Sequence, residues 1–153
     1  MIDRKGFIIL SQLRKNARES LTKMSRKTNI PVSTIFERLN SDDNAIKKHT
    51  TIIDFNKLGY LTIVNVLLSV KRSNKEELQY YLMKNRNVNS LYKIANGYDF
   101  LFEGIFKDMY ELESFMDDID ENFQIKSKQV LYLLKEIKRE DFLSSPEFVE
   151  CVG

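Results

Sequence analysis

Short polar and basic side chains gather in the first third of the chain in a pattern that suits recognition of a polyanion. Ser33, Thr34, Glu37 and Arg38 fall within one short predicted helix. Their hydroxyl, carboxylate and guanidinium groups can hydrogen-bond to base edges, and Arg38 can bind a guanine or a phosphate in a bidentate way. The candidates for phosphate contacts are Lys23, Arg26, Lys27, Lys47 and Lys48. In the alternative reading, Ser33 and Thr34 only cap the helix, Glu37 and Arg38 pair within the domain, and the lysines are a solvated surface.

The distribution of charge along the chain supports this interpretation, although the total does not. The 153 residues include 24 basic and 22 acidic side chains, for a net charge of only +2. Residues 1–50 hold 11 basic and 5 acidic side chains, a net charge of +6, and the remainder carries −4. This asymmetry indicates two modules, the first of which faces a polyanion.

Three short helices are predicted to position the basic residues. Asp3 and Ser20 are suitable N-caps for the first two, Asn29 suits a tight left-handed turn, and Pro31 stands where the third helix begins. Two short helices joined by such a turn are typical of a helix-turn-helix. The residues expected to be buried are Ile9, Leu10, Leu13, Leu21, Met24, Ile35 and Leu39.

After a turn-rich break at 40–44, the pattern changes to a mixture of strands and helices. We expect strands over 62–70, 88–95, 98–107 and 129–137. We expect helices that begin after Asn74 and Asp108, and a hairpin turn at Asn96-Gly97. The order from Tyr60 to Ile137 is strand, helix, strand, strand, helix, strand. This order predicts a ferredoxin-like antiparallel sheet with two helices on one face, and therefore an α+β chain.

The first predicted strand is apolar on both sides. Thr62, Val64, Val66, Leu68 and Val70 alternate along one face, and the other face carries Leu61, Ile63 and Leu67. Helices can cover only one of these faces, so we expect a second subunit to cover the other.

Taken together, the chain resembles the Lrp/AsnC family of transcription regulators over residues 3–138. The matching stretches are Asn16–Arg18, Ser20–Met24, Thr34–Leu39, Ile46–Tyr60 with Lys57-Leu58-Gly59-Tyr60 at its end, and Asn96–Phe100. The chain departs from the family in a longer first helix, a shorter 40–44 stretch and a missing glycine before the following strand. These departures predict an altered wing or an altered end of the recognition helix.

The resemblance implies a sequence-specific DNA-binding regulator that forms homodimers or higher homo-oligomers on double-stranded DNA. It divides the chain into a (winged) helix-turn-helix at 1–45, a linker strand at 46–59, a βαββαβ ligand-sensing and dimerisation domain at 60–138 and a C-terminal tail at 139–153. It also implies that an amino acid or a related effector binds at the hairpin. The residues involved are Asn96, Gly97, Tyr98 and Asp99, where glycine admits a ligand and the carboxylate can hold an ammonium group. In the alternative, these residues only form the turn and pair locally.

Two other functions remain open at this stage. The helix-turn-helix could compact DNA with little sequence preference, as an architectural protein does. Sirohaem decarboxylases share the two-module architecture, and His49 lies where they can carry a functional histidine. The chain has no second histidine, and it lacks a catalytic triad, a P-loop and a dinucleotide-binding motif. We therefore expect no enzyme activity, no catalytic residues and no cofactor.

Composition further narrows the class of protein to which the chain can belong. The acidic stretch Asp117, Asp118, Asp120 and Glu121 lacks the spacing of a calcium loop, so we expect a solvated helix face and no metal site. The single cysteine, Cys151, cannot form an internal disulfide, which favours a reducing compartment. No apolar run approaches the roughly 20 residues that a membrane helix needs. We expect a cytoplasmic protein without a membrane partner.

Overall fold

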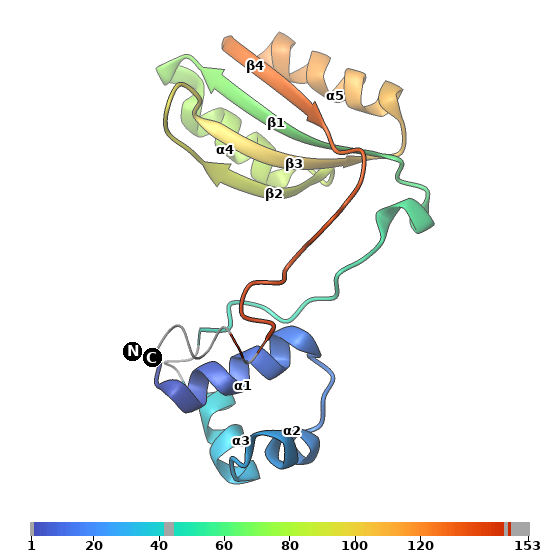
Figure 1. The fold of residues 1–153 in the computed structure, drawn as a ribbon. Helices are drawn as coiled ribbons and strands as arrows, with labels where there is room; N and C mark the ends of the chain where they lie inside the picture. Colours follow the sequence, from blue (N-terminus) through green and yellow to red (C-terminus); the bar gives the residue numbers. More distant parts are fainter. Residues whose placement is uncertain (1, 42–44, 146, 148–153) are drawn as a thin grey trace. The chain divides into compact units, whose positions relative to one another are not determined.

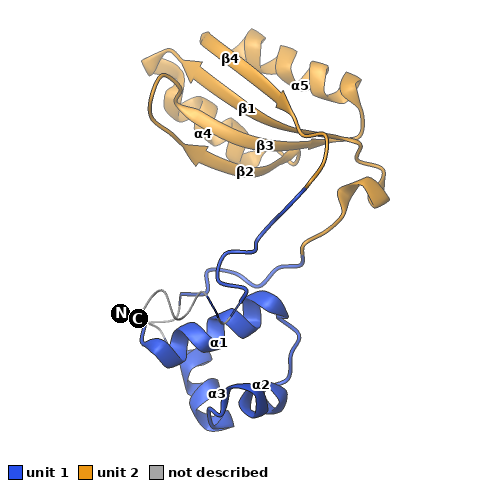
Figure 2. Cartoon of the chain, in the orientation of Figure 1, with its two compact units in different colours: residues 1–51, 137–153 blue, residues 52–136 orange. Residues whose placement is uncertain are grey.

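The computed structural model describes residues 2–41, 45–145 and 147. It divides into two compact units, which are coloured separately in Figure 2. Unit 1 comprises residues 1–51 and 137–153, and unit 2 comprises residues 52–136. The C-terminal segment therefore belongs to the same unit as the N-terminal helices.

Three helices form the body of unit 1: α1 (Arg4–Lys15), α2 (Leu21–Thr28) and α3 (Val32–Asn40). Their ends are set by local chemistry, as predicted. The Asp3 carboxylate accepts from the Gly6 N–H at 2.9 Å, and the Ser20 hydroxyl accepts from the Lys23 N–H at 3.3 Å. Asn29 ends α2 with a φ of 55°, which is the left-handed conformation that asparagine tolerates.

A small apolar cluster holds these helices together. Its buried members are Ile9, Met24, Ile30 and Ile35, and the half-buried Ile8, Leu13, Leu21 and Leu39 pack around them. Each helix contributes to this cluster, so the orientation of α3 depends on very few side chains.

The C-terminal segment, which shows no clear sequence pattern, contacts α1 within unit 1. The Arg14 guanidinium donates to the Phe142 carbonyl at 2.7 Å and to the Glu140 carboxylate at 3.0 Å. Ser144 donates to the Asp141 carbonyl at 2.9 Å. The pKa of the Asp141 carboxyl is lowered, first by a hydrogen bond from Lys138 and then by the one from Ser144.

The linker strand predicted over 46–59 is not present. Residues 45–54 form neither helix nor strand, and a short 3₁₀ helix, η1 (Phe55–Leu58), follows and ends at Gly59 with a φ of 85°. A strand needs a hydrogen-bonded neighbour. The described part of unit 1 contains only helices as regular elements, so it offers neither a partner for this segment nor a wing hairpin.

Unit 2 is the predicted βαββαβ arrangement (Figure 1). Its elements are β1 (Thr62–Val70), η2 (Arg72–Asn74), α4 (Lys75–Lys84), β2 (Val88–Lys93), β3 (Phe100–Phe106), α5 (Met109–Asn122) and β4 (Ile125–Tyr132). The sheet order is β2-β3-β1-β4 with antiparallel neighbours, and α4 and α5 lie on one face. The fold class predicted from the sequence is confirmed.

The last strand lies earlier than predicted. The apolar run Val130–Leu134 favours a strand over 129–137, but β4 begins at Ile125, directly after α5. It pairs with β1 from Val70↔Ile125 to Val64↔Tyr132. Because β4 is an edge strand, its polar first half remains exposed, and an apolar pattern does not detect it.

The core lies between the sheet and the two helices. Val64, Val66 and Leu68 from β1 meet Leu78 and Leu82 from α4, all at 0% exposure. Phenylalanines fill the rest: Phe115 of α5 packs edge-on against Phe102 at 5.8 Å and tilted against Phe106 at 5.3 Å between ring centres. Such ring pairs stabilise a core beyond their buried area. Met109, which the helical pattern places on the buried side of α5, is instead exposed at its first turn.

The opposite face of the sheet is not covered by any helix of unit 2, and apolar side chains lie on it beside the polar Asn65, Glu103 and Gln129. Leu61, Leu131 and Leu133 are exposed, and Ile63, Leu67 and Leu101 are half-buried. The two-sided apolar character predicted for the first strand is therefore present in the fold, with helices on one side only.

Candidate nucleic-acid interface and effector site

The third helix has one buried side and one open side. Ile35 is fully buried in the cluster of unit 1, and Leu39 is half-buried one turn later. On the open side, Ser33 and Glu37 are exposed. Val32 is 41% exposed and Phe36 59% exposed. This arrangement holds the helix from one side and leaves the other available to a partner.

The start of α3 has no side-chain cap. Its N-cap is Pro31, and within the described part of the chain no side-chain cap hydrogen bond forms at this end. The hydroxyls of Ser33 and Thr34 therefore do not cap this helix, which was the alternative role predicted for them. Uncapped N–H groups at a helix N-terminus favour an anion.

Arg38 pairs within unit 1. Its two terminal nitrogens donate to the two carboxylate oxygens of Asp3, at 2.7 and 2.6 Å. The pKa of the Asp3 carboxyl lies below its ordinary value, first because of the Gly6 N–H and then because of Arg38. This bidentate pair ties α3 to the start of α1 across 35 positions of sequence. It matches the alternative in which Arg38 has a partner inside the domain.

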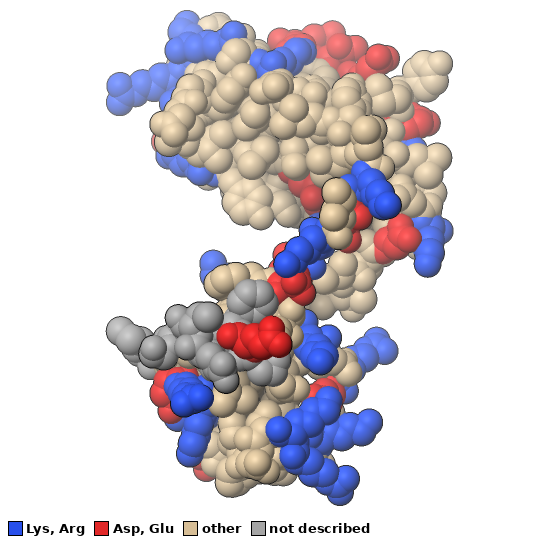
Figure 3. All heavy atoms as spheres, viewed as in Figure 1, with Lys and Arg blue, Asp and Glu red and all other residues tan. Residues whose placement is uncertain are grey.

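The predicted phosphate contacts lie on the surface. Lys23 and Arg26 are exposed on α2, and Lys27 is exposed but pairs with the Glu19 carboxylate. Lys47 and Lys48 are exposed on the segment that follows the described end of α3. Figure 3 shows Lys and Arg side chains gathered on the side of unit 1 that carries α2. A basic surface therefore lies beside the open α3 helix.

The predicted effector residues form the turn between β2 and β3. Asn96 and Gly97 both have positive φ, 68° and 97°, as a tight hairpin requires. Both are exposed, whereas Tyr98 and Asp99 are half-buried. The turn is closed by the Ile94 N–H, which donates to the Asp99 carbonyl at 3.0 Å.

The Asp99 carboxylate already holds an ammonium group. Lys75 Nζ lies 2.5 Å from Asp99 Oδ1, and the Val70 N–H donates to Oδ2 at 2.9 Å. Burial raises the pKa of Asp99, but the hydrogen bonds from Lys75, Val70 and Ser69 outweigh it and hold the pKa below its ordinary value. Asp99 is therefore ionised and paired, as the local alternative predicts.

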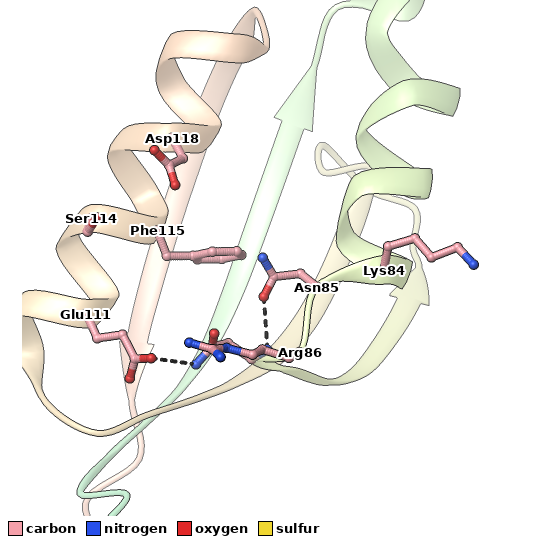
Figure 4. Close-up of a pocket in the computed structure, with 8 residues that line it drawn as sticks. Lys84, Asn85, Arg86, Glu111, Ser114, Phe115 and Asp118 are labelled. Atoms are coloured by element: carbon pink, nitrogen blue, oxygen red, sulfur yellow. Dashed lines mark hydrogen bonds between the residues drawn. The ribbon is translucent and has the colours of Figure 1, made fainter.

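A hollow of about 520 Å³ lies between the end of α4 and the side of α5 (Figure 4). The Phe115 ring points toward Asn85, and the Lys84 side chain points away from both of them. The Glu111 carboxylate accepts from the Lys107 N–H at 2.7 Å and from the Asn87 amide at 3.3 Å. These polar groups tie α5 to the neighbouring chain segments, and sequence reasoning had assigned them no role.

The remaining candidates form no assembled site within the part of the chain that the structure describes. No group of His, Cys, Asp or Glu there could hold a metal ion, and the acidic stretch of α5, Asp117, Asp118, Asp120 and Glu121, is exposed. His49 is exposed, and Cys151 lies outside the described residues. Across the same residues, none of the helices is long and apolar enough to cross a membrane.

Comparison with known proteins finds similarity to transcriptional regulators in both a family model and individual relatives. The family model described as the Lrp/AsnC ligand binding domain matches residues 63–143. The HTH-type transcriptional regulators FL11 of Pyrococcus abyssi and Pyrococcus horikoshii are 29% and 30% identical to the chain over 136 residues, or 88% of this chain and 88% of each relative.

Solved structures agree at the level of the fold. The transcriptional regulator NMB0573 of Neisseria meningitidis, in complex with L-Met, is similar with a TM-score of 0.82 at 20% identity, over 91% of this chain and 94% of that one. LrpC of B. subtilis is similar with a TM-score of 0.81 at 22% identity, over 90% of this chain and 98% of that one.

Proposed function

Because the chain belongs to the Lrp/AsnC family of transcriptional regulators, we propose that it regulates transcription by inserting α3 into the major groove of specific DNA sites. The observation that carries this proposal is the single-sided burial of α3. Ile35 anchors the helix, and its other side, with an uncapped first turn, stands open beside a basic surface. A recognition helix presents its N-terminal residues to base edges in this way.

The individual DNA contacts follow from the proposed entry of α3 into the major groove. Ser33, Thr34 and Glu37 are proposed to reach base edges. Lys23, Arg26, Lys27, Lys47 and Lys48 are proposed to bind phosphates. Asp3 occupies two of the five N–H donors of Arg38, so the first role of Arg38 is to fix the angle of α3, and a phosphate contact must use its remaining donors or exchange this partner.

The test is a gel-shift titration on genomic fragments, including the protein's own promoter, at several salt concentrations. We expect affinity to fall with salt by about 0.9 log units per log unit of salt for each phosphate contact. The double variant Lys23→Ala/Arg26→Ala should lower that slope by about 1.8. Lys126→Ala, which removes an exposed lysine of β4, is the matched control and should leave the slope unchanged. Absence of binding at low salt contradicts the proposal.

We further propose that the open face of the sheet is covered by a second chain. Leu61, Leu67, Leu101 and Leu131 share that face, and an apolar surface of this kind is stabilised by association. Leu131→Glu should shift the protein from dimer or higher oligomer toward monomer in sedimentation equilibrium. Leu134→Glu is the control, because Leu134 is 95% exposed beyond the end of β4. A wild-type protein that sediments as a monomer at all concentrations contradicts this proposal.

The proposed effector site is the turn Asn96–Asp99, and its ligand is an amino acid or a related small molecule. An incoming ammonium group must compete with Lys75 for the Asp99 carboxylate. Titration calorimetry with the common amino acids, including methionine because NMB0573 was solved with L-Met, tests this site. Lys75→Met should strengthen binding and Asp99→Asn should abolish it. Unchanged affinity in both variants would place the effector elsewhere.

The architectural alternative uses the same interface with little sequence preference. Footprinting separates the two functions, because a local regulator protects discrete, phased sites and an architectural protein protects DNA broadly. The decarboxylase-like alternative gains no support from the exposed position of His49.

A further inference from the structure

The exposed surface of α3 carries two apolar side chains along the edge that adjoins its buried side, next to Ser33 and Glu37. Val32 and Phe36 are four positions apart, which places them on the same side of a helix, and they are 41% and 59% exposed. Neither belongs to the cluster that anchors unit 1. Phe36 directly follows the fully buried Ile35, about 100° further round the helix, so its ring lies at the edge of the buried side and is exposed to solvent.

The helix α3 itself has no unpaired cation. Arg38 is the only basic residue in the helix, and both of its terminal nitrogens are bound to Asp3. The end of the guanidinium that carries both terminal nitrogens is therefore occupied while this pair persists. The cations of the surface, Lys23 and Arg26, lie on α2, where they suit phosphates and do not read bases.

These two features indicate which chemical groups of DNA the exposed apolar side chains of α3 can contact. The major groove displays the C5-methyl of thymine as an apolar group between two charged backbones. Apolar side chains on α3 match this methyl group, and the exposed cations of α2 match the phosphates on either side of the groove.

We propose that Phe36, supported by Val32, is a specificity-determining residue that contacts thymine methyl groups, so that the protein selects sites with adjacent thymines. This inference rests on the proposed entry of α3 into the major groove. Each methyl group buried against the ring contributes about fourfold to affinity. Two methyl groups together contribute about fifteenfold.

The experiment compares DNA that differs only in this methyl group. Duplexes that bind the protein are selected from a random pool. The selected sequence is then prepared once with thymine and once with uracil, which pairs identically but lacks the methyl. We expect wild-type affinity, measured by gel shift with excess non-specific DNA, to fall about fifteenfold on uracil DNA. Phe36→Ala should bind both duplexes equally and retain the wild-type melting temperature.

Lys23→Ala is the matched control: it should weaken binding to both duplexes and preserve their ratio. Equal binding of thymine and uracil DNA by the wild-type protein overturns the role of Phe36 while leaving the proposed function intact. The same conclusion follows if Phe36→Ala keeps the wild-type ratio. Failure to bind any duplex at low salt overturns the proposed function itself, and the inference with it.

Discussion

Ile35 is predicted to control the stability of unit 1 without affecting unit 2. Its side chain is fully buried among Ile9, Met24 and Ile30, the other buried members of its apolar cluster among the described residues. Ile35→Ala removes three carbon groups, worth about 2.4 kcal/mol at about 0.8 kcal/mol each. The cavity left behind brings the expected loss to about 2–5 kcal/mol.

That loss is large for a unit of this size. At about 0.05–0.15 kcal/mol per residue, the roughly 70 residues of unit 1 have a total stability of about 3–10 kcal/mol. Ile35→Ala therefore removes a large part of it, and α3 loses its anchor. DNA binding should be lost at 37 °C even though no residue on the open side of the helix has changed.

The sequence provides a spectroscopic way to separate the two units. The chain has no tryptophan and seven tyrosines, and all of the tyrosines lie in unit 2: Tyr60, Tyr80, Tyr81, Tyr92, Tyr98, Tyr110 and Tyr132. Tyrosine fluorescence therefore follows unit 2 during urea unfolding, whereas far-ultraviolet circular dichroism follows the helices of both units. Ile35→Ala should shift an early dichroism transition to lower urea and leave the fluorescence midpoint unchanged.

Leu82→Ala is the reciprocal control, because Leu82 is fully buried in unit 2 and its truncation carries a similar cost. It should shift the fluorescence midpoint. A single transition that moves equally in both variants would refute the independence of the two units. An Ile35→Ala protein with wild-type unfolding would refute the burial argument.

Three further changes test unit 2. Gly104→Ala places a Cβ 2.5 Å from Phe106 Cε2, so we expect the free energy of unfolding in urea to fall by about 1–3 kcal/mol. Adding Phe106→Leu should recover part of this loss, and additive losses in the double variant would contradict the clash. Asp108→Ala removes the carboxylate that accepts from the Glu111 N–H at 2.9 Å. The free energy of unfolding in urea should fall by about 0.5–2 kcal/mol, and an unchanged value would show that this cap contributes nothing to stability. Because the pKa of Asp99 is lowered, its ionised form stabilises the fold at pH values above the ordinary aspartate pKa of 3.8, and this contribution disappears as the pH falls through the folded-state pKa. Asp99→Asn should therefore melt below wild type at pH 7 and approach it at low pH, and an equal difference at both pH values would count against this pairing.

The elements whose cause is local could be predicted from the sequence. Asp3 and Ser20 cap their helices, and Asn29 and Asn96-Gly97 adopt positive φ as their residue types favour. The alternation of Phe100, Phe102 and Phe106 correctly predicts the buried side of β3. In each case the interacting groups lie within a few residues, so the pattern contains the whole physical cause.

The boundaries that depend on a distant partner could not be predicted in this way. The start of β4 is set by pairing with β1, and the predicted strand over 46–59 lacks a neighbour in the described chain. The exposure of Phe36 could be predicted from the sequence, but its role could not. Phe36 lies next to Ile35 and outside the buried helical period, which predicts an exposed ring. A role in binding follows only once the structure shows which side of α3 is exposed.

Composition, charge distribution and helical period by themselves determined that this chain carries a basic helix-turn-helix followed by a βαββαβ unit. Only the tertiary structure decided which charges are free to act. Arg38 is bound by Asp3, and Asp99 is bound by Lys75 and the Val70 N–H, over separations of 24 to 35 residues. Such pairs form because folding brings the groups together at low cost in entropy once the core is packed, and no local pattern records that proximity.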